Sequence, residues 1–337
     1  MNSPRLQKPE VLFVISIDAE ERWDWSGPFP DKTFNVDNIQ RVPRFQAFCE
    51  GLGLRPTYFT DYPVVVDPQG AAVFRELAGN SNCEIGAHLH PWANPPFYEA
   101  TDEIRSHVVN LPIEQARMKL DSLLEAMETE LDVRPQAFRT GRWGINAPIL
   151  ELLRARGFTV DSSMYPCYSN EFFDCEETPL SPYFPNFDHP TEEGSQRDIM
   201  EVPVTVGFNW RNQAFGRALY KRISNPRFEP FRVVGAFWQS HLLRKIYLSP
   251  EVMSGREMRP LVDKVIANGH PVLHMFLHSS SLVNNSQGIM SHPRAFETIS
   301  HAIEELLDHL QEKAAVRFCT ISEAAALIQH WYKKHAA

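Results

Sequence analysis

Residues 11–21 read Val-Leu-Phe-Val-Ile-Ser-Ile-Asp-Ala-Glu-Glu, an almost unbroken apolar run that ends in acidic side chains. A strand that is buried on both faces of a parallel sheet is typically a near-continuous run of this kind. A secretory signal would instead place a small-residue cleavage site after its apolar core. We therefore predict that Val11–Asp18 is a buried strand, with Asp18 and Glu20 at its carboxyl end.

Further short apolar runs follow, and segments with helical spacing lie between most of them. This alternation predicts an α/β fold with a parallel sheet. Seven or eight such units would close into a barrel, in which functional residues lie at the carboxyl ends of the strands. The expected strands are Val11–Asp18, Pro56–Asp61, Cys83–His88, Gln136–Thr140, Phe158–Ser162, Met200–Val206, Pro271–His278 and Val316–Thr320. The expected helices are Ile39–Gly51, Ala71–Ala78, Ile113–Leu131, Ala147–Arg156, Glu257–Asn268, Ala295–Leu310 and Ser322–His335.

Two stretches interrupt the alternation. Residues 165–197 are rich in proline, acids and aromatics, as is typical of a long loop that covers a site. Residues 208–248 combine eight Lys and Arg residues with many aromatics. We expect a single domain, 1–337, in which both stretches are insertions. Candidate catalytic residues spread from Asp18 to His278 can meet only if one sheet brings the strand ends together.

The composition excludes several classes of protein. The chain has 337 residues, 43% of them hydrophobic, and a formal net charge of −9, which argues against a nucleic-acid partner. It has no uninterrupted apolar stretch of the roughly 18–20 residues that span a bilayer, so we expect a cytoplasmic protein. Its five cysteines are scattered and form no Cys-x-x-Cys pair, which indicates neither a disulfide framework nor a thiolate zinc site.

Polar side chains of catalytic type recur where the predicted strands end. Residues two apart on a strand share a face, so Asp18 and Glu20 can converge, and so can His88 and His90. Imidazoles with a carboxylate suit Zn, Co, Ni or Fe, with zinc the first choice, and leave positions open for water and substrate. A second carboxylate could then act as general base on the bound water.

In their order along the chain, these motifs resemble those of the polysaccharide deacetylases, the NodB homology domain of carbohydrate esterase family 4. Ser16–Glu20 looks like a divergent form of the family's Thr-Phe-Asp-Asp-Gly motif, and Pro56–Phe59 is similar to its Ala-Thr-Phe-Phe. The resemblance covers roughly residues 11–278. Further along the chain, Glu84–His88 matches the start of the family motif Glu-Ile-Gly-x-His-x-x-x-His, and Arg139 matches the arginine of its third motif. Asp161 matches the aspartate of the fourth motif, and Phe276–His278 matches the fifth motif, Leu-x-His.

The resemblance implies a partly open seven-stranded (β/α) barrel. It also implies a divalent metal held by one acid and two histidines, and hydrolysis of an N-acetyl group on an amino-sugar glycan or glycan precursor; O-acetyl groups are a related target. By this resemblance, Asp18 would be the general base, Glu20 the metal carboxylate and His88 the first imidazole ligand.

The resemblance assigns three further residues. Arg139 would orient Asp18, His278 would protonate the leaving amine, and Asp161 would tune His278. At these positions the family's motifs place an arginine, an aspartate and a histidine, which is what this sequence has.

The sequence departs from the family pattern at three places. Trp92 stands where the family has its second histidine, and we expect His90 to replace it. The Asp-x-Glu spacing leaves open whether Asp18 or Glu20 binds the metal. Gly141–Gly144 replaces the usual Pro-Tyr, and we expect Arg142 and Trp143, together with Trp92, to contact the substrate.

Other functions remain open at this point. A metal-dependent amidohydrolase carries His-x-His on its first strand, whereas this chain has acids there. A glycoside hydrolase would need a second carboxylate opposite the first, which Glu171, Asp174 or Glu176 could supply. A metal-free hydrolase, or a hydrolase of another C–N amide, would use the same barrel. A non-catalytic glycan-binding protein would use aromatics such as Trp23 and Trp25.

The basic and aromatic stretch 208–248 allows two interpretations. It could form a solvated pair of helices packed on the barrel. Alternatively, it could present a cationic surface to an anionic acceptor, either a diphosphate-linked sugar or a lipid-linked glycan at the inner face of the membrane.

Overall fold

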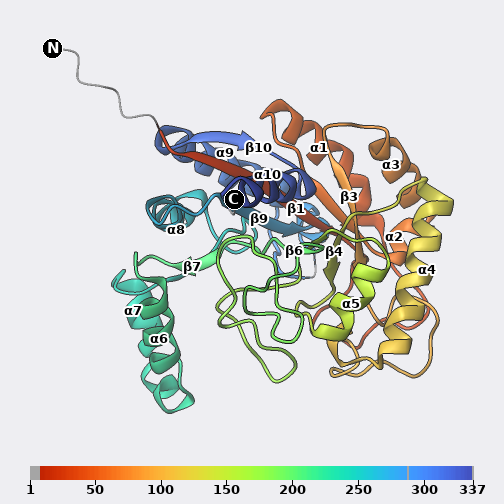
Figure 1. Cartoon of the computed structure of the whole chain (residues 1–337), viewed down its shortest axis with the longest axis horizontal. Coiled ribbons are helices and arrows are strands. Elements are labelled where there is room, and N and C mark those ends of the chain that lie inside the picture. The colour runs from red at the N-terminus through yellow and green to blue at the C-terminus, as the bar shows by residue number, and fades with distance from the viewer. Residues whose placement is uncertain (1–7, 287, 336–337) are drawn as a thin grey trace.

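The structure is a computed structural model that describes residues 8–286 and 288–335. At its centre lies a parallel sheet built around β1 (Glu10–Ala19), which is almost entirely buried (Figure 1). β9 (Val272–His278) pairs with β1 along one side. On the other side, β10 (Ala315–Phe318) pairs with the amino-terminal half of β1, and β2 (Thr57–Thr60) pairs with the carboxyl-terminal half.

From β2 the sheet continues through short strands in chain order, each parallel to the one before. These strands are β3 (Glu84–Leu89), β4 (Ala137–Thr140), β5 (Val160–Asp161) and β6 (Met200–Glu201). Backbone hydrogen bonds bridge the gap between β6 and β9: Thr205 N donates to His274 O at 2.9 Å, and Phe276 N donates to Leu248 O at 3.1 Å. The result is the predicted partly open barrel of seven strands, with β10 as an eighth strand beside β1.

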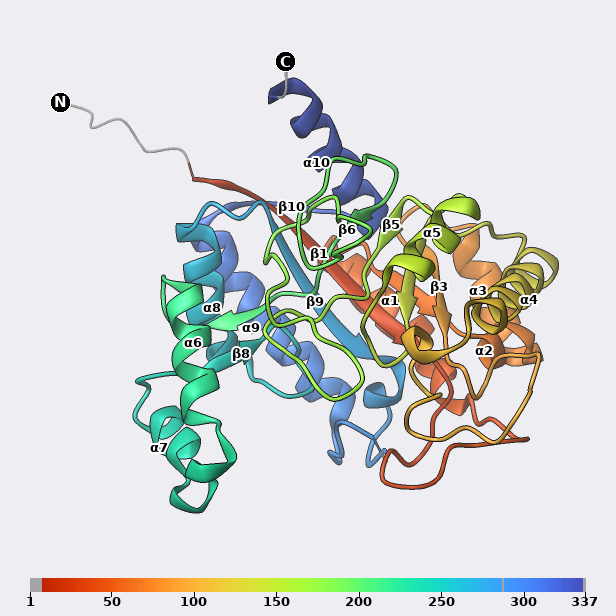
Figure 2. The same ribbon diagram turned by 60° about the horizontal axis from the view of Figure 1, so that its bottom comes forward.

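Helices cover the outside of the sheet (Figures 1 and 2). Each helix predicted from the sequence is present, within a few residues at its ends. Three short helices around the sheet were not expected: α2 and the 3-10 turns η2 and η4. Asp61 caps α2 by accepting from Val64 N, and Pro63 lies in its first turn, as is common at a helix start. The helices packed around the sheet are η1 (Asp37–Arg41), α1 (Val42–Gly51), α2 (Tyr62–Val66), α3 (Pro68–Ala78), η2 (Val108–Asn110), α4 (Ile113–Leu131), α5 (Ala147–Ala155), α8 (Gly255–Ala267), η4 (Ser279–Leu282), α9 (Ala295–Lys313) and α10 (Ile321–His335).

The expected strand Met200–Val206 is wrong in its second half. β6 ends at Glu201, and Val206–Phe208 forms β7, which pairs antiparallel with β8 (Lys245–Tyr247) in a separate two-stranded sheet. Pro203 lies between the two parts. Proline has no N–H to give to a strand ladder, so the run is broken there.

The two predicted insertions differ in character. Residues 162–199 form a long loop held by isolated bridges, such as the one between Tyr183 and Glu201. Residues 208–248 add α6 (Gln213–Ile223), η3 (Pro226–Phe231) and α7 (Val233–Gln239), which project away from the barrel in both views (Figures 1 and 2). Within the described ranges, no helix is both long and apolar enough to cross a membrane.

Candidate active site

Strand register brings the predicted site residues together at the carboxyl edge of the sheet. Asp18 on β1 lies opposite His278 on β9, and His88 on β3 lies opposite Arg139 on β4. Because every strand of the barrel runs in the same direction, residues at the ends of β1, β3, β4 and β9 share one end of it. All four of these side chains are buried.

Glu20, His88 and His90 form a compact cluster. Glu20 Oε2 lies 3.2 Å from His88 Nε2 and 3.4 Å from His90 Nε2, and the two imidazole centroids are 4.8 Å apart. Although β3 ends at Leu89, His90 still lies on the same side as His88. Burial acts to raise the pKa of Glu20, but the neighbouring histidines outweigh it and hold this pKa below its usual range.

The second nitrogen of each imidazole is already engaged. His88 Nδ1 lies 3.1 Å from the backbone oxygen of Arg139, and His90 Nδ1 lies 2.9 Å from Glu21 Oε2. Both partners offer oxygen atoms, so each Nδ1 can donate to its partner while each Nε2 faces Glu20.

The donor set of Glu20, His88 and His90 suits a divalent transition metal. Two imidazole nitrogens and a carboxylate are typical zinc ligands, and acceptors behind the imidazoles are their usual support. The other carboxylate oxygen, Glu20 Oε1, is buried without a hydrogen-bond partner among the described residues. An orphaned buried oxygen needs a partner, and a cation would supply one. Ligand atoms of a neighbouring group, Asp18, Glu20 and His278, also lie within 4.8 Å of one another.

A second layer holds His90 from behind. Trp92 stacks on His90 with 4.2 Å between ring centroids, and its indole Nε1 donates to Glu21 Oε1 at 2.5 Å. Glu21 therefore joins the two rings through its two carboxylate oxygens. Burial raises the pKa of Glu21 to about 7, and burial together with the negative charge of Glu21 raises the pKa of Asp61 well above its usual value.

Arg139 holds Asp18 in a buried network. Its Nη1 lies 2.5 Å from Asp18 Oδ1, and its Nη2 donates to Ser16 Oγ at 2.8 Å and to Ser162 Oγ at 3.0 Å. Burial acts to raise the pKa of Asp18, but the charges of Arg139, His88 and His278 more than offset it, and the pKa is lowered. Asp18 is thus an oriented, ionised carboxylate beside the histidine cluster.

His278 lies on the other side of Asp18. Its Nε2 is 3.7 Å from Asp18 Oδ2, and its Nδ1 is 3.1 Å from Glu251 Oε2. Glu251 also accepts from the backbone N–H of His278 at 2.7 Å. Burial lowers the pKa of His278, but the negative charges of Glu251, Glu20 and Asp18 outweigh it and raise the pKa to about 10. His278 therefore carries a proton at neutral pH.

Asp161 does not occupy the place expected for it. It accepts from Ser163 Oγ at 2.6 Å and lies opposite Glu201 on β6. The carboxylate that contacts His278 is Glu251. The expected tuning of His278 by Asp161 is therefore replaced by Glu251, because the loop after β8 brings Glu251 to the end of β9.

A cavity of about 270 Å³ opens above these groups. Arg142 and Trp143, both with positive φ, lie on its wall as expected for substrate contacts. Trp143 stacks on Tyr165, with 4.8 Å between the ring centroids. The cavity is lined by Asp18, Glu20, Trp25, His88, His90, His107, Thr140, Arg142, Trp143, Tyr165, Tyr168, Asn170, Phe173 and His278.

Trp92 is not among the residues that line this cavity. It is only 3% exposed and lies behind His90, on the side of a neighbouring groove. The expected substrate contact by Trp92 is therefore replaced by support of His90, because its ring is covered by His90, Trp23 and Phe29.

Comparison with known proteins identifies the fold. No protein-family model matches the sequence, and no curated protein matches it. A solved structure from Parabacteroides distasonis, described as a glycoside hydrolase or deacetylase, superposes with a TM-score of 0.60 at 13% identity, covering 98% of this chain and 73% of that one. A structure from Mycobacterium smegmatis, described as a polysaccharide deacetylase, gives 0.56 at 14% identity, covering 98% and 93%.

This chain has the polysaccharide deacetylase fold. The same fold accommodates a Puue allantoinase, which superposes with a TM-score of 0.52 at 15% identity and covers 99% of this chain and 94% of that one. The resemblance inferred from motif order is thus confirmed for the fold, and the low identities mark a divergent chain.

Within this deacetylase fold, several partners were not predicted from the sequence. Glu21 directly follows Glu20, so the sequence showed that it lies near the site but not that it contacts His90 and Trp92. His274, four residues before His278 on one strand face, accepts from Ser16 Oγ at 2.8 Å. No sequence pattern indicated that Glu251 contacts His278, because Glu251 lies in a loop 27 residues before it. The loop acids considered for glycoside hydrolysis lie elsewhere: none of Glu171, Asp174 and Glu176 lines the cavity.

Proposed function

We propose that this protein is a metal-dependent hydrolase that removes an acetyl group, an N-acetyl group first of all, from an amino-sugar glycan or glycan precursor. One observation carries the proposal. The Nε2 atoms of His88 and His90 converge on Glu20, beside an ionised Asp18 and a protonated His278. A ligand set, a base and an acid therefore line one cavity.

Glu20, His88 and His90 would hold the cation, and Asp18 would remain free to act as base. A bound divalent cation lowers the pKa of a coordinated water and polarises the acyl oxygen. Arg139 directs Asp18 through the short contact to its Oδ1 and leaves Oδ2 towards His278. Asp18 Oδ2 is then the atom that accepts the proton of the attacking water.

His278 would act as the general acid. Its proton is retained at neutral pH because Glu251 stabilises the imidazolium through Nδ1. The Nε2–H is then free to be given to the leaving amine. An acid and a base with pKa values pushed apart by their surroundings are the usual arrangement for such paired proton transfers.

The walls of the cavity suit a sugar ring. Trp143, Tyr165 and Trp25 present aromatic surface, and Arg142 adds a donor that is anchored by Glu103 and Ser106. The volume of about 270 Å³ is slightly below the roughly 300–1,000 Å³ typical of sites for drug-sized ligands. We therefore favour a single sugar unit within the cavity, either free or at the end of a longer molecule.

A metal-free amide hydrolase is the second candidate. The contacts of 3.2 Å and 3.4 Å also allow Glu20 to accept directly from the two imidazoles, with no cation between them. In that case Asp18, which Arg139 orients, would serve as the base. The two candidates differ in their metal content, which can be measured directly.

The test combines metal analysis with acetate release. Purified protein should contain about one transition metal per chain and release acetate from N-acetylated oligosaccharides or nucleotide sugars. Asp18→Asn should lose acetate release and keep the metal, whereas His88→Ala should lose both. Turnover by fully demetallated protein would favour the metal-free candidate, and acetate release from neither substrate set would refute a deacetylase.

A further inference from the structure

The segment 208–248, which we call the α6–α7 unit, is an outgrowth with its own small core. It projects from the barrel at one corner (Figures 1 and 2). Phe208, Ile223 and Leu243 are buried within it, together with Cys167 from the long loop. Side chains on its outer surface are therefore not needed to fill the core of the barrel.

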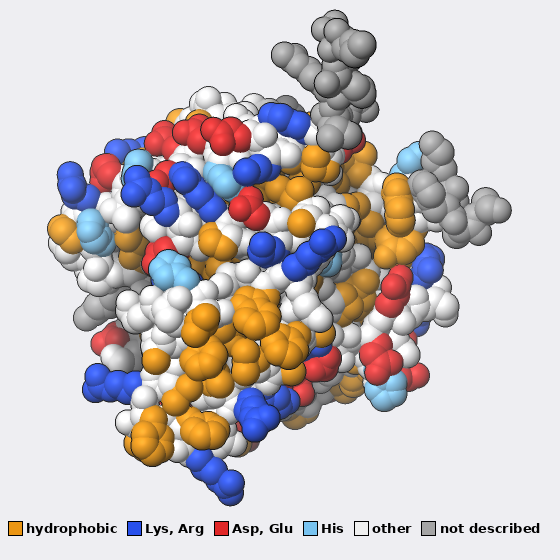
Figure 3. All heavy atoms as spheres, turned by 90° about the vertical axis from the view of Figure 1, so that its left-hand side faces the viewer, with side chains coloured by type: hydrophobic (Ala, Val, Ile, Leu, Met, Phe, Trp, Pro, Cys, Tyr) orange, Lys and Arg blue, Asp and Glu red, His pale blue; other side chains and the backbone are white. Residues whose placement is uncertain are grey.

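Four large apolar side chains of this unit face solvent. Phe215 is 50% exposed, Phe228 42%, Phe231 74% and Leu242 57%. Figure 3 shows hydrophobic side chains gathered into a patch on this side of the molecule, with Lys and Arg around it. Scattered exposed residues are ordinary on soluble proteins, but a contiguous rimmed patch marks an interaction site.

The charge of the unit is opposite to that of the chain as a whole. It has eight Lys and Arg residues and a single acid, Glu229, in a chain whose net charge is −9. Four of the arginines are exposed and form no ion pair with any other described residue: Arg211, Arg222, Arg227 and Arg232.

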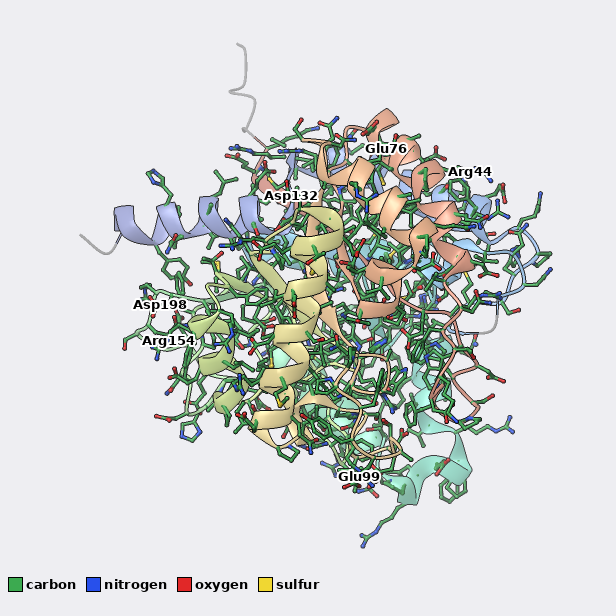
Figure 4. The ribbon with its side chains drawn as sticks, turned by 90° about the vertical axis from the view of Figure 1, so that its right-hand side faces the viewer. Arg44, Glu76, Glu99, Asp132, Arg154 and Asp198 are labelled. Carbon is green, nitrogen blue, oxygen red and sulfur yellow. The ribbon has the colours of Figure 1, made fainter. Side chains whose placement is uncertain are left out.

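Two exposed arginines on the other side of the molecule, Arg44 and Arg154, are paired with acids. Figure 4 shows that side, with Arg44 and Arg154 labelled. Arg44 is paired with Glu297 at 3.0 Å, and Arg154 lies 3.7 Å from Asp198. Within the α6–α7 unit, the four unpaired arginines thus lie in the same segment as the exposed aromatic side chains.

A groove runs between the end of α6 and α7. Its volume is about 590 Å³, and its lining is mainly apolar, from Ile223, Pro226 and Phe228 to Val233 and Val234. Its polar lining residues are Ser224, Glu229 and Arg232. An apolar floor with a cation at its side suits a molecule that carries both an acyl chain and an anionic head group.

We propose that the α6–α7 unit binds an anionic lipid bilayer. Basic residues attract anionic lipids, while exposed Phe and Leu insert at the boundary between head groups and acyl chains. A second copy of this chain is the less favourable occupant, because pairing two such faces would bring two sets of unpaired arginines together.

Binding there would also orient the candidate active site. Arg217 Nη2 contacts Glu177 Oε2 at 2.6 Å, and Lys221 Nζ contacts Glu176 Oε2 at 2.8 Å, which ties α6 to the long loop. The same loop supplies Tyr168, Asn170 and Phe173 to the cavity wall. The proposal itself does not depend on the metal chemistry.

Vesicle flotation tests the proposal. Wild-type protein should float with vesicles of phosphatidylcholine containing phosphatidylglycerol, should not float with pure phosphatidylcholine, and should dissociate as salt is raised. A basic residue near an anionic surface contributes about 1 kcal/mol, so Arg222→Gln/Arg227→Gln should lower partitioning by about 30-fold. Phe228→Ser/Phe231→Ser should weaken binding even at low salt, because insertion is lost.

The matched control is Arg44→Gln/Arg154→Gln, which removes the same charge from the opposite side and should float like wild type. Circular dichroism confirms that each variant is folded. Absence of flotation at low salt would refute the proposal, and so would equal loss in the control pair. A third outcome would also overturn the proposal: the protein does not bind vesicles, sediments as a dimer, and becomes monomeric in Phe228→Ser/Phe231→Ser. That result would show that this face mediates self-association.

Discussion

The indole of Trp92 stacks on the imidazole of His90, with 4.2 Å between their centroids and 20° between their planes. Glu21 links the same two rings by hydrogen bonds. The residue at the expected histidine position is thus used to fix the orientation of a histidine two residues earlier. This relationship fixes the orientation of the His90 imidazole, as the proposed role of metal ligand requires.

Loss of this support should weaken metal binding. Carboxylates behind metal-bound imidazoles typically contribute 10- to 100-fold in affinity, so Glu21→Gln should reduce zinc affinity by about tenfold. Trp92→Phe keeps the stacking but loses the indole donor, and we expect a smaller effect. Competition with a chelator measures both. Glu84→Gln, at the opposite end of β3, is the control, and equal affinity in Glu21→Gln and this control would contradict the assignment.

The Asp18–Arg139 pair should be strongly coupled in stability. Removing one partner of a buried ion pair leaves an uncompensated charge and costs about 3–5 kcal/mol, so Arg139→Met should lower the free energy of unfolding by about that amount. The double variant Asp18→Asn/Arg139→Met removes both charges and should lose less than the sum of the single variants. Urea denaturation in the presence of a chelator measures this, and strict additivity would show that the pair is not coupled.

Activity should depend on pH through His278. A proton donor must be protonated, so the rate should fall as pH rises through the pKa of His278, which neighbouring carboxylates raise to about 10. Glu251→Gln removes a negative charge beside Nδ1 and should move this alkaline limb to lower pH. Glu305→Gln, on the same side of the barrel but without contact to His278, should leave the profile unchanged. If the alkaline limb of the pH–rate profile does not shift in Glu251→Gln, Glu251 does not set the pKa of His278.

Lys119 should contribute to stability rather than to chemistry. It is 4% exposed, and its Nζ donates to the carbonyl oxygens of Pro91, Asn94 and Pro96 at 2.6–2.9 Å. Lys119→Met leaves three carbonyl groups without their donor and should lower the free energy of unfolding by about 3 kcal/mol. Lys313→Met, on an exposed helix end, should change it by less than about 0.5 kcal/mol. Equal midpoints for the two variants in thermal unfolding would contradict this.

Much of the fold was predictable because the elements are distinct in sequence. Val11–Ile17 is apolar except for Ser16, and Ala147–Arg156 begins after Asn146, which caps α5 by accepting from Ile149 N. Such signals depend only on residues within the element or next to it, so distant parts of the chain do not change them. The strand break at Pro203 could have been predicted from the lack of an N–H, but the antiparallel pairing of β7 with β8 depends on a segment about forty residues away.

The side chains that gather at the candidate site were more predictable than the partners that contact them. Parallel strands bring Asp18, Glu20, His88 and His278 to one edge, so their proximity follows from strand order. The pairing of His278 with Glu251 rather than Asp161 does not, because the loop that carries Glu251 packs according to tertiary contacts alone.

The sequence by itself determined the parallel α/β architecture and the set of polar residues at the strand ends, since hydrophobic periodicity and strand direction dictate both. Only the tertiary structure decided which acid serves which histidine, that Trp92 supports His90, and that the apolar and basic residues of 208–248 face solvent together. These depend on distances between segments far apart in the chain, and no local pattern encodes such distances.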